Sequence, residues 1–592
     1  MKKYLLMFVS SLMLVSCVDT IILPDDKTVD EDYWKTKEQV ASMVNAAYAA
    51  MADNAVIERL IVWGDFRTDE LLGPSGSVDN STTKTALDEI SAVNMQTTNM
   101  FGQWSAFYNV INRCNIVLER AEAVQQVDPN YEAGDYQVDR SQMLALRALC
   151  YFYLVRNFRD VPYITEAYMN SSQNMQVPQS APAVVLQHCI DDLEEAVKTS
   201  KKSNGLSVSD WTRVGYMTED AINSLLADIY LWRASVMHSQ ADYQMCIDYC
   251  DKVIASKKAQ HVRGFNEMTE KEFPLYCDAN VLYNRLFVEQ NAEESIFEIQ
   301  SRSNLPVCQY FYKYKSANNN GGEGWLRATK FFGSAASTYN TTTSLSSTTL
   351  YSDKDLRYYA ACYIPSTGDE TFSVRKMISG NGVTDMTPVK SRESYNYGGL
   401  SRNYSIYRVP DVMLMKAEAL VQLVDTTQSD SVKEALLRVP FTLIQAVNTR
   451  SIYQDNQADS MKWNGSTNAT RFRLLNKDSY EQLVMQERLR EFCFEGRRWY
   501  DLVRYNYRHI DGVDYNHTMA EIIDGGGTLP RNSSDMLSLM TRQRGAEADG
   551  VKNKMLNEAY LYMPVPNSDI VICPLLRQNP AYKDTNEYEK TY

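Results

Sequence analysis

The chain has 592 residues, of which 44% are hydrophobic and 23% charged, a composition typical of a folded globular protein rather than a disordered one. Its formal net charge of −14 makes nucleic acid an unsuitable partner, because such binding depends on Lys and Arg neutralising phosphates.

The N-terminal residues have the pattern of an export signal followed by a tether. Two lysines precede an apolar run over 5–15, which is shorter than the roughly 20 residues that cross a bilayer. The sequence therefore predicts a cleaved signal peptide over 1–16. Leu14-Val15-Ser16-Cys17 resembles the lipobox of bacterial lipoproteins, so Cys17 is the predicted lipidation site and 17–30 the tether.

Helical periodicity follows the tether and divides into pairs of helices. Apolar side chains recur at the i, i+3, i+4, i+7 spacing of amphipathic helices. The predicted pairs are 36–53 with 101–127, 141–159 with 183–200, 217–236 with 242–256, and 406–424 with 431–449. Helices of this length, with small residues where they cross, predict a mostly α, tetratricopeptide-like helical-hairpin scaffold with loop-rich insertions. A helical bundle without repeats is the alternative.

The segment between the third and fourth pairs differs in composition. It is rich in Tyr, Asn, Ser, Thr and Gly, with short strand-like pieces such as Ser295–Gln300. Loops on a rigid scaffold are where binding residues concentrate. The predicted organisation is a single domain over 31–592, with helical hairpins over 36–256 and 406–449, a loop-rich insertion over 257–400 and a C-terminal block over 480–592.

Cysteine and histidine usage argues against a metal site or a disulfide framework. Besides Cys17 there are ten cysteines, and six lie on apolar faces of predicted helices, where free Cys behaves as a small buried hydrophobe. The five histidines are scattered without ligand spacing, so no metal site is predicted. No phosphate-binding loop with its lysine is present, and no cofactor is expected.

Glu487, Glu491 and Glu495 are spaced so that their carboxylates share one helix face. Glycosidases use pairs of carboxylates roughly 5 to 10 Å apart, so a catalytic role is one interpretation. Four arginines surround the three acids, however, and Arg–carboxylate forks commonly satisfy charges at helix junctions. Neighbouring Arg also lowers a carboxyl pKa, which is unsuitable for a general acid. The pattern favours a structural role, and no catalytic residue is predicted.

Several motifs occur in an order that points to a family. They are Trp104-x₃-Tyr108-x₂-Ile111-Asn112-Arg113-Cys114-Asn115, Leu146–Val155 followed by Phe158-Arg159-Asp160-Val161-Pro162, Glu294–Ile299, Tyr407–Ala419, Glu487–Arg504, Tyr560–Pro566 and Gln578–Tyr582. The block E-R-x-x-E-F-x-x-E-G-x-R-W-x-D-L, which starts at Glu487, is the most specific. Together the motifs resemble the SusD/RagB family of Bacteroidetes outer-membrane nutrient-binding lipoproteins over essentially the whole mature chain. Asp160 and Lys416 are modest departures from the family pattern.

The resemblance implies a function without chemistry. We expect a lipid-anchored outer-membrane protein, facing the cell exterior, that binds a nutrient oligosaccharide and delivers it to a SusC-like TonB-dependent transporter. A peptide ligand, as in the RagB-like branch, is the alternative within this class. A surface glycan hydrolase and a purely structural lipoprotein are the alternatives from other classes.

Aromatic and polar side chains in loops are the candidate ligand-binding residues. A sugar ring lays its C–H groups on an aromatic face, while nearby amides and acids bind its hydroxyls. The candidates are Tyr310, Tyr312 and Trp325, in loops that the resemblance places at the ligand platform, Asp65 and Asn80, between the first paired helices, and Trp104, at a helix start. For Trp104, packing in the core is the alternative.

Overall fold

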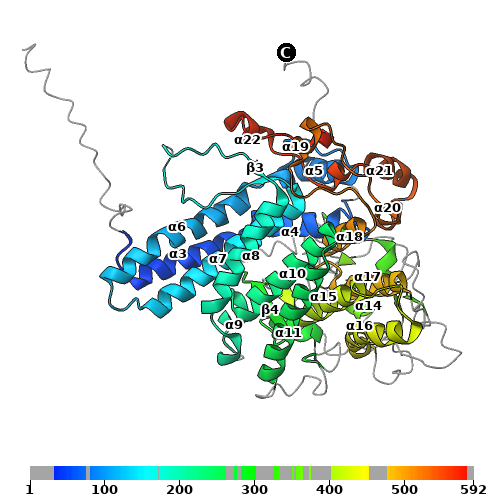
Figure 1. Ribbon diagram of the computed structural model, residues 1–592, viewed down its shortest axis with the longest axis horizontal. Coiled ribbons are helices and arrows are strands. Elements are labelled where there is room, and N and C mark those ends of the chain that lie inside the picture. Colours follow the sequence, from blue (N-terminus) through cyan, green and yellow to red (C-terminus); the bar gives the residue numbers. More distant parts are fainter. Residues whose placement is uncertain are drawn as a thin grey trace, which may run out of the picture.

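A series of long helices forms the scaffold, and each helix packs against the next (Figure 1). In chain order they are α3 (Lys37–Met51), α6 (Ser105–Val127), α7 (Ala133–Phe158), α8 (Pro182–Thr199), α10 (Glu219–Met237), α11 (Gln240–His261), α15 (Val409–Gln422) and α16 (Asp430–Ser451). The four predicted helix pairs are all in contact, and the predicted mostly helical fold is confirmed.

The computed structural model describes all of these helices and most of the C-terminal part of the chain. The described residues are 33–74, 81–170, 172–207, 209–261, 273–276, 282–301, 325–333, 335–336, 350–352, 355–363, 373–374, 376, 402–452 and 476–582. Within these ranges, no helix combines the length and the apolarity needed to cross a membrane.

Local chemistry explains where the scaffold helices begin and end. Thr36 caps α3 in a reciprocal capping box, in which the side chain of Gln39 accepts the N–H of Thr36 at 2.9 Å. Pro182 starts α8, at a position where a missing N–H costs nothing. His238 adopts a left-handed conformation that ends α10 and turns the chain directly into α11.

The other described helices pack around the scaffold. They are α4 (Asn54–Ile61), the π-helix η1 (Val62–Phe66), α5 (Ser81–Ser91), η2 (Met100–Gly102), η3 (Ser203–Gly205), α9 (Thr212–Gly215), the π-helix η4 (Asn284–Glu289), η5 (Lys330–Gly333), α14 (Leu356–Ala361), α17 (Lys477–Phe492), α18 (Arg498–Arg508), α19 (Met519–Asp524), α20 (Ser534–Thr541), η7 (Gly545–Glu547), α21 (Ala548–Lys554), η8 (Glu558–Leu561), α22 (Asn567–Ile572) and η9 (Pro580–Tyr582).

The described strands form two-stranded sheets. β4 (Ser295–Ile299) is antiparallel to β10 (Tyr404–Arg408), which leads directly into α15. The other pairs are β1 (Leu71–Leu72) with β5 (Arg327–Ala328), β2 (Val161–Pro162) with β3 (Gln179–Ser180), β6 (Ala335–Ala336) with β7 (Tyr351–Ser352), and β8 (Cys362–Tyr363) with β9 (Ser373–Val374). The sequence prediction of a strand at Ser295–Gln300 is therefore confirmed to within one residue.

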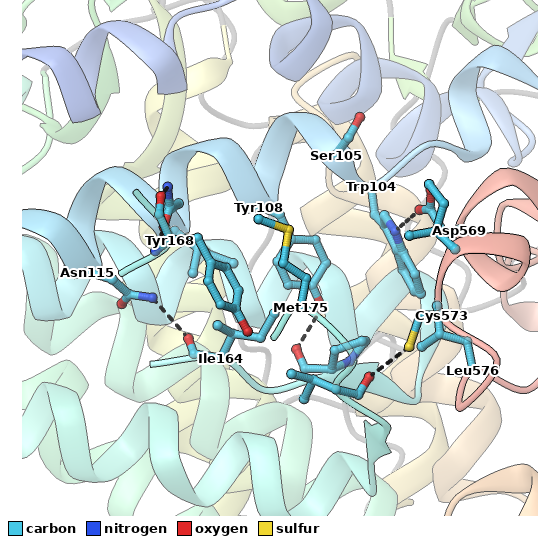
Figure 2. Close-up of a pocket in the computed structure, with 15 residues that line it drawn as sticks. Trp104, Ser105, Tyr108, Asn115, Ile164, Tyr168, Met175, Asp569, Cys573 and Leu576 are labelled. Carbon is cyan, nitrogen blue, oxygen red and sulfur yellow. Dashed lines mark hydrogen bonds between the residues drawn. The ribbon is translucent and has the colours of Figure 1, made fainter. Parts of the chain in front are cut away.

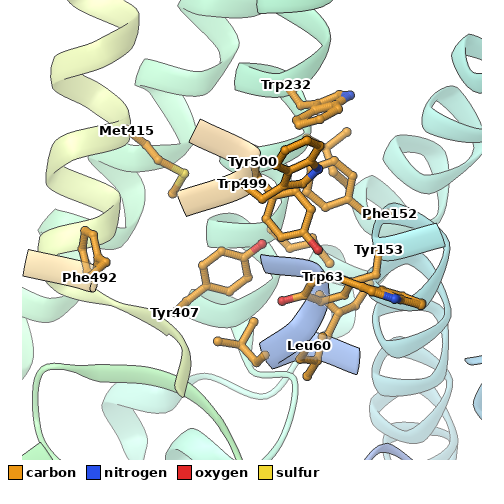
Figure 3. Close-up of a cluster of buried hydrophobic side chains, with 14 of the residues drawn as sticks. Leu60, Trp63, Phe152, Tyr153, Trp232, Tyr407, Met415, Phe492, Trp499 and Tyr500 are labelled. Carbon is orange, nitrogen blue, oxygen red and sulfur yellow. The ribbon is translucent and has the colours of Figure 1, made fainter. Parts of the chain in front are cut away.

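Large aromatic side chains fill the core where the scaffold meets the C-terminal helices (Figure 3). Trp63 of η1 stacks on Phe107 of α6 with ring centroids 4.9 Å apart. The guanidinium of Arg156 lies between two rings, 3.9 Å from the centroid of Phe152 and 4.0 Å from that of Tyr500. The described cysteines are all free and buried, and they include the six that the sequence places on apolar helix faces.

A network of buried charges surrounds Glu491 in α17. Its carboxylate receives hydrogen bonds from Arg357 at 3.1 Å, from Arg450 at 2.5 Å and from Arg408. Burial alone would raise the pKa of Glu491, but the charges of these arginines outweigh it and hold the pKa below its usual value.

The two neighbouring acids of α17 and its C-terminal turn are paired in the same way. Glu487 accepts from Arg357 at 2.7 Å and from Arg490 at 2.9 Å. Glu495 accepts from Arg408 at 2.9 Å and forms an ion pair with Lys376. All three carboxylates are buried, which agrees with their predicted structural role.

We expect Glu491→Gln to destabilise the fold by about 3–5 kcal/mol, because it leaves buried guanidinium groups without their compensating charge. Since the pKa of Glu491 is lowered in the folded state, this stabilisation is present at neutral pH and is lost as the pH falls through the folded pKa. Urea unfolding at pH 7 measures the difference. The control is Glu195→Gln, which breaks the solvent-exposed ion pair with Arg140 and is expected to cost less than about 1 kcal/mol. Equal effects of the two substitutions would contradict the role given to the network.

Candidate ligand-binding site

The structure separates the predicted ligand-binding residues into three groups. Tyr310, Tyr312 and Asn80 lie outside the described residues, as does Cys17. Trp325 and Asp65 are enclosed by protein, and each has no exposed surface. Trp104 lines an open cleft.

Asp65 lies in η1 and holds that element against the turn between α17 and α18. Its carboxylate accepts the backbone N–H of Gly496 at 2.7 Å and that of Arg497 at 3.1 Å. Burial raises the pKa of Asp65 to about 7, and the two N–H groups oppose this shift. The contact is close, because a Cβ on Gly64 would lie 2.2 Å from the carbonyl oxygen of Gly496. We therefore do not include Asp65 or the enclosed Trp325 in the site.

The cleft has a volume of about 310 Å³ and is formed by three parts of the chain (Figure 2). Trp104 and Tyr108 come from the start of α6. Tyr168 and Met175 come from the segment between β2 and β3, and Leu576 follows α22. A cleft of this size lies within the range of small-ligand sites, about 300–1,000 Å³.

Most of the polar side chains that line the cleft are bonded within the protein. Trp104 Nε1 donates to Asp569 at 2.5 Å, and the hydroxyl of Tyr108 donates to the carbonyl of Pro162 at 2.7 Å. Asn112 binds the backbone of Tyr168 in both directions, at 2.8 and 2.7 Å. The cleft therefore presents mainly rings and C–H groups.

Exposed apolar side chains surround the mouth of the cleft. Ile572, at the end of α22, is 70% exposed, and Met175 is 49% exposed. Val571 and Leu575 are also exposed in the same segment. Apolar residues gathered at an open hollow indicate a surface that another molecule covers.

The residues that line the cleft do not include the carboxylate pair of a glycosidase. Asp569 is the carboxylate among its lining residues, and the indole of Trp104 binds it. A glycosidase needs a second carboxylate roughly 5 to 10 Å away. Burial raises the pKa of Tyr108 well above its usual value, so its phenol stays neutral. The described residues also contain no group of His, Cys, Asp and Glu side chains that could hold a metal ion.

Sequence reasoning found one wall of this cleft and missed the other two. Tyr108 follows Trp104 by one helical turn, so the shared face of α6 could have been recognised. Asp569 and Leu576 are more than 400 residues away in the sequence, and no local pattern connects them to α6.

Two family models match the chain. The model described as the SusD family matches residues 309–582. The model described as starch-binding associating with outer membrane matches residues 23–231. Between them they cover α3 to most of α10, the hairpin of α15 and α16, and the C-terminal block up to residue 582.

Curated relatives and solved structures agree with these matches. A SusD-like protein of Formosa agariphila is 25% identical over 543 residues, which are 86% of this chain and 92% of the relative. A SusD-like protein of Bacteroides ovatus is 23% identical and aligns over 99% of both chains. The crystal structure of a SusD homolog from Bacteroides thetaiotaomicron superposes with a TM-score of 0.65 at 18% identity, covering 94% of this chain and 99% of that one. At 18% identity, this structural likeness shows the fold alone.

We expect Trp104→Ala to lower the free energy of unfolding by about 3–5 kcal/mol, because the indole is nearly enclosed and packs against Phe158 at 5.1 Å between ring centroids. Ile572→Ser removes a side chain at the mouth and should change stability by less than about 0.5 kcal/mol. Chemical denaturation of both variants distinguishes the wall of the cleft from its rim. A fully stable Trp104→Ala protein would show that the indole is not part of the core.

Proposed function

Because the chain belongs to the SusD/RagB family, we propose that it binds nutrient oligosaccharides at the outer membrane, without catalysis, and delivers them to a SusC-like TonB-dependent transporter. In this proposal, lipidation of Cys17 anchors the protein to the outer membrane, where it faces the cell exterior.

The burial of three glutamates supports the proposal that the protein binds its ligand without catalysis. Glu487, Glu491 and Glu495 are the acids with the spacing of a catalytic cluster, and all three are buried in arginine and lysine ion pairs. A substrate cannot reach them, and their lowered pKa values are unsuitable for a general acid. We therefore propose that the protein binds its ligand and transfers it to the transporter without reacting with it.

The choice of a glycan is supported by the family comparison. One matching model is described as starch-binding and spans most of the helical scaffold. Anchoring next to a transporter makes weak sugar sites sufficient, because tethering raises the effective concentration to roughly the millimolar range.

The cleft at Trp104 fits the delivery step. Most of its polar groups are already bonded and its mouth is apolar, a combination that suits apolar side chains of a protein partner better than sugar hydroxyls. We assign it to contact with the transporter.

Isothermal titration of the full-length protein in detergent against maltoheptaose, xyloglucan, levan and a pool of tryptic peptides tests the ligand class. We expect heat with at least one glycan and none with the peptides, and no new reducing ends after prolonged incubation. Heat only with peptides would overturn the glycan assignment and favour the peptide-binding alternative. Product formation by the wild-type protein would overturn the non-catalytic assignment.

Purification from solubilised outer membranes tests the transporter contact. We expect the protein to bring a TonB-dependent barrel with it, and Ile572→Asp to lower the yield of barrel severalfold because a charge enters an apolar contact. The matched control is Val127→Asp, which changes an exposed apolar residue at the far end of α6 and should leave the yield unchanged. Equal yields for both variants would remove the cleft from the interface.

A further inference from the structure

A second hollow, of about 370 Å³, lies beside Trp211 and is separate from the cleft at Trp104. It is formed by the end of α3, by Trp211 and α9, and by β4 with the residues that flank it. α9 and α22 lie at opposite edges of the molecule in Figure 1, so the two hollows do not form one site.

Trp211 forms an exposed aromatic wall of this hollow. Its side chain is 43% exposed, an uncommon state for an indole. Gly215 allows the ring to lie directly on the backbone of α9, because a Cβ there would be 2.6 Å from Cε3 of Trp211. Tyr216 contacts the indole edge-on with ring centroids 5.2 Å apart. The wall is thus held in place before any ligand binds.

Two tyrosines form a fixed apolar surface next to it. The rings of Tyr48 and Tyr216 are tilted against each other with centroids 4.7 Å apart. The hydroxyl of Tyr216 donates to Asn45 at 2.6 Å, and that of Tyr48 donates to Gln142 at 3.1 Å. Burial raises the pKa of Tyr48 well above its usual value, so the phenol remains neutral.

Amides supply the polar part of the lining. Gln300 Nε2 donates to Asn291 Oδ1 at 2.9 Å, which orients both side chains. Among the described residues, no acceptor binds the Nδ2 group of Asn291 or the indole N–H of Trp211. Both groups are therefore available as hydrogen-bond donors to a ligand.

The backbone before Asn291 is held in an uncommon conformation. Gln290 has φ 66° and ψ 173°, a region that is almost restricted to glycine, and Asn291 follows with φ 53°. Surrounding contacts maintain this geometry: the side chain of Gln290 accepts the N–H of Asn403 at 2.6 Å, and that of Glu298 accepts the N–H of Asn291 at 3.1 Å. Backbone strain of this kind concentrates at ligand-binding positions.

The lining as a whole carries no charged side chain. It combines aromatic faces with neutral amides, and it has room for a small ring. An uncharged ligand with one apolar face and many hydroxyls matches this chemistry, and a pyranose ring has both features.

We propose that this hollow is a sugar-binding subsite, in which the Trp211 indole stacks on a pyranose ring and the Asn291 amide, oriented by Gln300, binds its hydroxyls. The assignment rests on the proposed glycan-binding function and gives that function a location. It also predicts a preference for neutral over acidic sugars.

Titration of full-length Trp211→Ala with the glycan that the wild-type protein binds tests the subsite. We expect affinity to fall about tenfold or more, equivalent to about 1.4 kcal/mol, and Trp211→Phe to recover most of the loss because a ring remains. Gly215→Ala should also weaken binding, since the added Cβ displaces the indole without removing it. Ile572→Ser, in the other cleft, should bind as the wild type does.

The possible results separate the two proposals. If Trp211→Ala, folded by circular dichroism, binds the glycan as tightly as wild type, the subsite is wrong while the glycan-binding function stands. If the wild type binds peptides and no glycan, both proposals fail. Tighter binding of an oligogalacturonide than of neutral oligosaccharides would also overturn the subsite as described.

Discussion

The burial of the α17 carboxylates among arginines is the constraint on which the rest of the structure depends. Removing a charge from water costs several kcal/mol, and the cost is offset only when all partners are in place. Arg357 belongs to α14, Arg408 to the end of β10 and Arg450 to the end of α16, so the chain must bring these elements to α17 before Glu491 is satisfied. The network therefore joins the insertion, the last scaffold hairpin and the C-terminal block in one arrangement. The same pairing removes the acids from any catalytic use.

This network also fixes the strand that borders the Trp211 hollow. Arg450 binds Glu294, the residue before β4, at 2.5 Å, and the carbonyl of Glu294 accepts the N–H of Val409 at the start of α15. Lys257 of α11 donates to the carbonyl of Ser295 at 2.7 Å. The position of β4 is thus set from two sides. Gln300 directly follows β4, so the buried charges outside the hollow also fix its position.

The sequence was most informative where the determining interactions are local. The four helix pairs follow from apolar periodicity. The neighbouring arginines led to the correct structural role for Glu491, but its actual partners, Arg357, Arg408 and Arg450, come from distant elements. Burial of Asp65 and Trp325 could not be predicted, because it depends on residues far away in the chain: Asp65 binds the backbone of Gly496, some 430 positions later. Trp211 had no distinguishing pattern either. Only the structure shows that Gly215 holds its ring in place and that Asn291, 80 positions later, lies in the same hollow.

The two hollows differ in one physical respect that separates their roles. In the cleft at Trp104 the indole N–H is bound to Asp569, and the surface left over is apolar, which favours contact with another protein. In the hollow at Trp211 the indole N–H and an amide remain available beside an aromatic face, which favours a hydroxylated ligand. Because α9 and α22 lie at opposite edges of the helical scaffold, the ligand that we propose can occupy one hollow while the proposed partner covers the other. The proposed ligand binding and the proposed contact with the partner then use different side chains.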